Sequence, residues 1–254
     1  MIQINQLYKS FGKLEVLKGI DLEFSGSGRI TAILGPNGSG KTTLIKCLLG
    51  MVIPQDGTIL FDGKEVSHEW GYRNAIDYLP QITRFPDNLT VREVIDLIQQ
   101  IRGNTTGDRT LIQQFGLEKY LDDKVRNLSG GTRQKLNLTL TFMYDNPVLI
   151  LDEPSNGLDP VAMQQLRKLV AARKAAGKIV LMTTHIMSLV EEMADEVVFL
   201  LEGKIYFKGS VEMLKARYGE TSVEAAIAAI LQQEQDKPST QFAHQGIPST
   251  LQIA

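Results

Sequence analysis

One glycine-rich segment has residue types and spacing that suit phosphate chemistry. It fits the pattern G-x-x-x-x-G-K-[ST] and reads Gly35-Pro36-Asn37-Gly38-Ser39-Gly40-Lys41-Thr42. The glycines let the backbone turn its N–H groups onto phosphate oxygens, and a helix beginning at the end of the segment adds the positive end of its dipole. Lys41 would reach the β- and γ-phosphates, and the Thr42 hydroxyl would ligate Mg²⁺. The segment therefore predicts a nucleotide-binding loop.

Two carboxylates follow an apolar run at 148–151, which predicts a buried strand. In open α/β sheets, ligands bind at the carboxyl ends of the strands, so Asp152 and Glu153 would face the same site as the loop. Asp152 suits the coordination of Mg²⁺, directly or through a water, and Glu153 suits a general base or an orienter of attacking water. The alternative is a strand end that carries two solvated acids.

A lone histidine, His185, follows another predicted strand at 179–183. Such a residue is more often structural or simply exposed. If its strand belongs to the same sheet, however, His185 would be directed at the γ-phosphate.

The elements that must position these groups alternate in type and predict an α/β fold. Short strands broken by turns fill the first quarter of the chain, and helical spacing dominates 82–146. Two capping boxes, Thr90 with Glu93 and Thr221 with Glu224, mark expected helix starts.

Composition excludes several classes of protein. The 254 residues carry 27 Lys and Arg against 29 Asp and Glu, which gives no basic footprint for nucleic acid. The longest apolar runs are too short to span a bilayer, and the single cysteine, Cys47, indicates a reducing compartment. We expect a soluble, cytoplasmic protein whose link to a membrane goes through a partner.

A motif between the loop and the acidic pair resembles the signature of ABC-type ATPases. It reads Leu128-Ser129-Gly130-Gly131-Thr132-Arg133-Gln134. A Ser hydroxyl and two Gly N–H groups at a helix N-terminus form a second phosphate cradle. In this order, the motifs resemble an ABC ATPase from about residue 1 to residue 210.

This resemblance implies a P-loop NTPase core with an N-terminal antiparallel β subdomain and an inserted helical subdomain. We expect the core and the β subdomain over 1–81 and 146–210, the helical signature subdomain over 82–145, and C-terminal helices over 211–234. Residues 235–254 are rich in Gln, Ser, Thr and Pro, which is typical of a disordered tail.

The resemblance also implies a composite ATP site, in which the signature of one subunit closes over the ATP held by the loop of another. The implied signature residues are Ser129, Gly130 and Gly131. Phe11 matches the aromatic residue that stacks on adenine, and Gln81 matches the glutamine that reaches Mg²⁺ and the attacking water. Residues 155–159 match the loop that crosses the dimer interface.

The remaining roles are assigned by the same resemblance. Catalysis is expected from Glu153, Gln81 and His185, the last matching the histidine that contacts the γ-phosphate. Mg²⁺ is expected at Thr42, Gln81 and Asp152. The expected ATP contacts are Phe11, Gly35, Pro36, Asn37, Gly38, Ser39, Gly40, Lys41, Thr42 and Thr43.

The implied function is that of an ATPase subunit that drives separate integral-membrane permease subunits. Two copies of the subunit would form a homodimer around two ATP molecules. The dimer would lie at the inner face of the cell membrane, bound to the permease. The permease contact is expected around 82–97, where Phe85 and Pro86 are either exposed anchors or parts of a packed turn. Thr132 stands where many members have Gln. That departure and the short C-terminal region favour exporter-type systems, which include the copper-processing ATPases of nitrous oxide reductase maturation.

Two other classes of function compete with this one. Soluble ABC-type ATPases that act on DNA or ribosomes carry a long coiled-coil insertion or a second ATPase unit, but only 85 residues lie between Thr42 and Leu128. A small P-loop kinase or GTPase would leave the motif at 128–134 unexplained, and the guanine-reading sequence Asn-Lys-x-Asp is absent from the chain.

Overall fold

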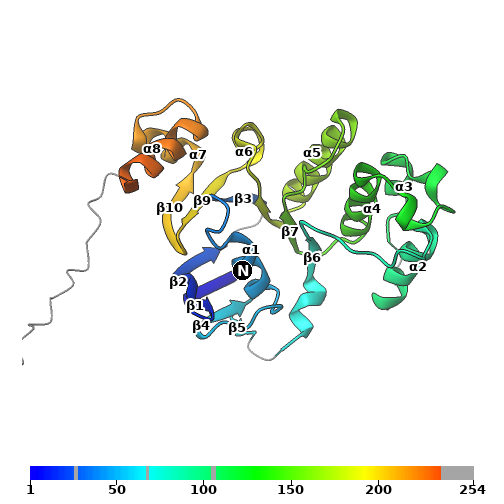
Figure 1. Ribbon diagram of the computed structural model, residues 1–254, viewed down its shortest axis with the longest axis horizontal. Coiled ribbons are helices and arrows are strands. Elements are labelled where there is room, and N and C mark those ends of the chain that lie inside the picture. Colours follow the sequence, from blue (N-terminus) through cyan, green and yellow to red (C-terminus); the bar gives the residue numbers. More distant parts are fainter. Residues whose placement is uncertain (26–27, 67–68, 104–106, 236–254) are drawn as a thin grey trace, which may run out of the picture.

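The computed structural model describes residues 1–25, 28–66, 69–103 and 107–235 (Figure 1). The tail expected over 235–254 lies outside this part of the chain, apart from Gln235, which ends the last helix. Within the described ranges, no helix has the length and apolar character needed to cross a membrane.

A six-stranded sheet forms the centre of the molecule. Its strands, in spatial order, are β10 (Lys204–Ser210), β9 (Glu196–Leu201), β3 (Arg29–Leu34), β8 (Ile179–Thr183), β7 (Val148–Asp152) and β6 (Ile76–Leu79). All of them run parallel except β10, which is antiparallel to β9. The central strands are near-continuous buried apolar runs, as expected when both faces of a parallel sheet are covered. Because β3, β7 and β8 are parallel, the segments that follow them meet at one edge of the sheet.

A smaller antiparallel sheet packs beside the first. Its strands, in spatial order, are β2 (Leu14–Phe24), β1 (Ile2–Phe11), β4 (Asp56–Phe61) and β5 (Lys64–Glu65). Its apolar side chains form one core with α1 (Lys41–Leu48) and one face of the larger sheet, where Ile4 and Ile20 join Leu44 and Ile150. The turn between β1 and β2 places Phe11 close to the start of α1.

Helices dominate the chain between β6 and β7. They are α2 (Val91–Ile101), α3 (Thr110–Gln114) and α4 (Gly130–Phe142), with 3-10 turns at Glu118–Tyr120 and Val125–Asn127; another such turn, Gly71–Ala75, precedes β6. The capping box at the start of α2 is confirmed, since Glu93 N donates to Thr90 Oγ1 and Thr90 N donates to the Glu93 carboxylate. Phe85 is half-buried against the core, whereas Pro86 is exposed and Ile82 is 76% exposed.

In the part of the chain that the structure describes, four helices follow β7 and pack on the side of the larger sheet that faces away from α1 (Figure 1). They are α5 (Pro160–Ala175), α6 (Met187–Met193), α7 (Val211–Tyr218) and α8 (Val223–Gln235). Asp159 caps α5, because its Oδ1 accepts from Ala162 N at 2.8 Å. At α8 the predicted capping box is wrong: the Ser222 hydroxyl, and not that of Thr221, accepts from Ala225 N.

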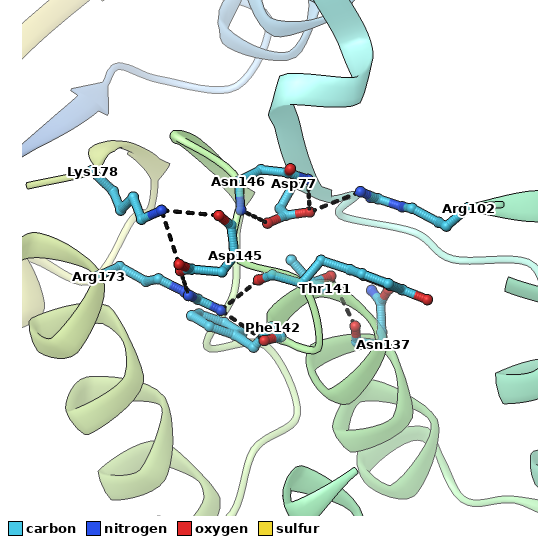
Figure 2. A network of polar contacts seen from close by, with 10 residues as sticks. Asp77, Arg102, Asn137, Thr141, Phe142, Asp145, Asn146, Arg173 and Lys178 are labelled. Atoms are coloured by element: carbon cyan, nitrogen blue, oxygen red, sulfur yellow. Dashed lines mark hydrogen bonds and ion pairs between the residues drawn. The ribbon is translucent and has the colours of Figure 1, made fainter. Parts of the chain in front are cut away.

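A polar network ties the helices of the middle region to the sheet at the edge opposite the segments after β3, β7 and β8 (Figure 2). Asp77, 2% exposed on β6, pairs with Arg102 at the end of α2 (3.2 Å) and accepts from Asn146 (2.8 Å). Nearby, Arg173 of α5 binds Asp145 and donates to two main-chain carbonyl oxygens at the end of α4. These contacts connect α2 and α4 to the start of β6 and β7.

Candidate nucleotide-binding site

A cleft of about 380 Å³ opens at the carboxyl edge of the larger sheet, within the size range of small-ligand sites. Its lining residues are Phe11, Leu14, Val16, Asn37, Gly38, Gly40, Lys41, Thr42, Thr43, Gln81, Asp152 and Glu153. All of these except Leu14 and Val16 were singled out from the sequence. The structure therefore brings together the glycine-rich loop, the acidic pair, the glutamine and the aromatic residue.

The loop between β3 and α1 follows a path that requires glycine. Gly35 has φ of 151°, and a Cβ there would lie 2.0 Å from the carbonyl oxygen of Leu200. Lys41 Nζ donates to the loop's own carbonyl oxygens, at 2.7 Å to Gly35 and 3.1 Å to Pro36. The Ser39 hydroxyl is buried in the loop and has no hydrogen-bond partner among the described residues. The loop is thus a backbone cradle with a cation folded against it.

Electrostatics at the loop follow from this burial. Burial lowers the pKa of Lys41, although the carboxylates of Glu153 and Asp152 act in the opposite direction. Both carboxylates therefore lie close enough to the Lys41 ammonium group to stabilise its charged form.

Asp152, 2% exposed, is held between two threonine hydroxyls. Thr42 Oγ1 lies 3.4 Å from Asp152 Oδ2, and Thr183 Oγ1 donates to Asp152 Oδ1 at 2.6 Å. Sequence reasoning missed Thr183. Its only signal was its place as the last residue of a predicted strand, beside the strand that ends in the acid.

Glu153 adopts a backbone conformation that side chains rarely take, with φ of 52°. Its N–H is held by the Thr183 hydroxyl at 3.0 Å and lies 3.2 Å from the Thr183 carbonyl oxygen. Its Oε2 lies 2.8 Å from His185 Nδ1, and the His185 side chain is 69% exposed. The turn after β7 thus directs the carboxylate into the cleft, and His185 contacts it from the solvent side.

The end of the cleft at the smaller sheet is apolar. Phe11 is 52% exposed, and Lys9 Nζ lies 5.1 Å from the centre of its ring. Leu14, 67% exposed, and Val16 complete this wall. Sequence reasoning missed both, because neither belongs to a motif and only the pairing of β1 with β2 brings them beside Phe11. An exposed flat ring with apolar neighbours suits the stacking of a base.

The signature residues do not line this cleft. Ser129 caps α4 by accepting from Thr132 N at 3.2 Å, and Ser129 and Gly130 are exposed. At Gly131, a Cβ would lie 2.9 Å from the carbonyl oxygen of Gly157, so the helix start closely approaches the loop after β7. The residues expected to form a second phosphate cradle therefore lie outside the cleft that holds the first.

Comparisons with known proteins agree with this arrangement. The family model described as ABC transporter matches residues 17–156. A Streptococcus pyogenes protein named lantibiotic transport ATP-binding protein SrtF is 33% identical over 209 residues, covering 81% of this chain and 89% of the relative. The Nod factor export ATP-binding protein I of Burkholderia lata is 33% identical over 219 residues, covering 84% of this chain and 72% of its own length. Neither name supports the copper-processing prediction.

Solved structures give the same result. An ATP-binding subunit of an ABC transporter superposes with a TM-score of 0.84 at 27% identity, covering 91% of this chain and 99% of the other. A dimeric ATP-binding cassette bound to ADP and Pi, at 20% identity and a TM-score of 0.73, covers 83% of this chain and 98% of the other and shares the fold. The chain belongs to the ABC transporter family, as an ATP-binding and ATP-hydrolysing subunit.

Proposed function

We propose that two copies of this chain close around two ATP molecules with Mg²⁺, and that hydrolysis lets them part and so drives export through a separate membrane permease. Support for export comes from the names of relatives, which include lantibiotic transport and Nod factor export proteins.

The observation that carries this proposal is the separation of the two phosphate cradles. The loop at 35–42 lies in the cleft, whereas Ser129, Gly130 and Gly131 lie outside it at the start of α4. One chain therefore supplies the phosphate loop of one ATP site and the signature of another. A second copy, turned to face the first, would complete both.

The cleft's oxygen atoms suit Mg²⁺. The Thr42 hydroxyl and the Asp152 carboxylate lie 3.4 Å apart, and Gln81 lines the same cleft. Mg²⁺ at nucleotide sites is usually held by one or two carboxylates together with substrate phosphates and water, and this cleft supplies Asp152. When bound, Mg²⁺ would neutralise phosphate charge.

The proposed catalytic steps fall to this chain's own side chains. Lys41, released from the loop carbonyls, would bind the β- and γ-phosphates, and Phe11 would stack on adenine. Glu153 would accept a proton from the attacking water, which Gln81 would help to orient. His185, already 2.8 Å from Glu153, would contact the γ-phosphate.

The permease would meet the region that follows Gln81. Ile82 is the most exposed large apolar residue there, and Pro86 is also exposed. We further propose that residues 82–145 form a unit that turns relative to 1–81 and 146–210 and passes this motion to the permease.

The Glu153→Gln variant tests the dimer. It should bind ATP without turnover and give a stable ATP-bound dimer by light scattering, because the amide keeps the size of the side chain but cannot accept the proton. An ATP-bound monomer would contradict the composite site. Wild type with ADP is the control and should remain monomeric.

Purification of the same variant from native membranes with ATP and Mg²⁺ tests the partner. Recovery of a multi-spanning membrane protein supports the permease. Recovery of ribosomes or DNA-repair proteins would instead favour the soluble class of ABC ATPase.

A further inference from the structure

Helix α4 begins at the signature and also contacts loops that lead to the cleft of its own chain. Its first turn carries the exposed signature, Ser129 and Gly130. In the dimer proposed above, that turn lies at the nucleotide held by the partner. The next turns of the same helix contact the loops of its own cleft.

The first of these contacts reaches the acidic loop. Gln134 Nε2 donates to the carbonyl oxygen of Pro154 at 3.1 Å. Pro154 directly follows Glu153, whose rarely adopted backbone conformation must be held in place by its surroundings. A shift of α4 would therefore act on the residue that is proposed to receive the proton.

A second contact joins the helix to the loop at 155–159. Lys135 Nζ lies 2.5 Å from Asp159 Oδ2, and the Lys135 side chain is 25% exposed. The same carboxylate caps α5 through its other oxygen, which accepts from Ala162 N. Lys135 thereby lowers the pKa of Asp159 and, with Ala162, fixes the far end of this loop. The close approach of Gly131 to Gly157 fixes its middle.

The third contact reaches the glutamine. Asn137, 4% exposed, donates from Nδ2 to the carbonyl oxygen of Pro80 at 3.4 Å. Pro80 directly precedes Gln81. A buried amide that has a hydrogen-bond partner favours one arrangement over alternatives, because separation would leave polar groups unpaired in the interior.

We propose that α4 connects the two ATP sites of the dimer, with Gln134, Lys135 and Asn137 as positioning residues that transmit engagement of the partner's nucleotide to Glu153 and Gln81 of their own cleft. The inference rests on the proposed dimer. It goes beyond that dimer because it gives Gln134, the last residue of the signature motif, and Lys135 and Asn137, which follow it, a role in the cleft of their own chain.

Mixed dimers with a single active site test this assignment. One copy, the active copy, keeps Glu153; the other carries Glu153→Gln, and different affinity tags allow the mixed species to be purified. Lys135→Met is placed in either copy, and ATP turnover and ATP affinity are measured. In the active copy the substitution should slow turnover about tenfold with little change in affinity; in the Glu153→Gln copy it should leave turnover within about twofold.

The two placements separate an action on the chain's own cleft from support of the signature. If Lys135 only supported the signature, the substitution would act from the Glu153→Gln copy, whose signature closes the active site. An effect of that kind, or no effect from the active copy, would overturn the proposal. Lys135→Arg in the active copy should restore turnover, and Asn137→Leu should reproduce the loss.

Arg167→Met serves as the matched control. Arg167 pairs with Glu192 at 3.1 Å between α5 and α6, away from the cleft, and should affect turnover from neither copy. If the Glu153→Gln copy formed no dimer with ATP, the proposed function would fail together with this inference. If the dimer forms but Lys135 acts from the wrong copy, only this inference fails.

Discussion

Thr183 is the buried residue on which the geometry of both acids depends. Its hydroxyl donates to Asp152 Oδ1 at 2.6 Å and accepts from Glu153 N at 3.0 Å, and the residue is fully buried. Thr183→Val keeps the shape of the side chain and removes both hydrogen bonds. Glu153 N would retain the nearby main-chain carbonyl oxygen, so the main loss is the partner of a buried carboxylate.

The size of the effect follows from that loss. A hydrogen bond to a charged group contributes about 1.5–3 kcal/mol, so the free energy of unfolding should fall by about 2 kcal/mol. For a chain of this size that corresponds to a fall of roughly 4–8 °C in Tm. Turnover should also fall, by about tenfold, which requires only about 1.4 kcal/mol of lost transition-state stabilisation.

Urea unfolding and steady-state ATP hydrolysis measure the two effects. Thr31→Val is a matched control, because Thr31 Oγ1 donates to Glu196 at 3.2 Å in the same sheet and the residue is 4% exposed. It should lower stability but leave turnover unchanged, and Thr183→Ser should restore both. Stability within about 0.5 kcal/mol of wild type, with normal turnover, would refute the reasoning.

Three further predictions concern the cleft and the core. Lys41→Ala should abolish ATP binding by calorimetry, and unchanged affinity would remove the loop from the site. Phe11→Ala should raise the KM for ATP roughly tenfold at unchanged kcat, as expected for lost stacking, and Phe11→Trp should preserve it. Burial raises the pKa of Cys47 to about 11 from 9.0. Between these values the unfolded chain releases the thiol proton while the folded chain keeps it, so stability should fall as pH rises; urea unfolding of Cys47→Ala should show a shallower decline.

The central strands could be predicted because nearly all of their residues are apolar, as expected for strands that are buried on both faces. The apolar runs at 148–151 and 179–183 have the length and composition that are typical of buried strands, and both form such strands. By contrast, β6 (Ile76–Leu79) is four residues long and contains Asp77, whose burial depends on Arg102 and Asn146 far along the chain. Burial of the Asp77 charge is tolerated only because the fold brings these two partners to it.

The same distinction applies to the site. The loop and the acidic pair were found because their chemistry depends on neighbours in sequence. Thr183 and Leu14 were missed because their roles arise only from strand pairing. At the start of α8, adjacent Thr221 and Ser222 can both cap a helix, and packing rather than residue type decides between them.

The backbone at Glu153 has a consequence for how this sequence can change. Glycine adopts its φ of 52° without the steric cost that a glutamate bears there. Replacement of Glu153 by glycine would therefore relieve backbone strain, but it would also remove the proposed proton acceptor. Selection for stability alone would therefore favour glycine at this position, whereas selection for ATP hydrolysis would favour glutamate. A chain no longer selected for ATP hydrolysis is expected to lose Glu153.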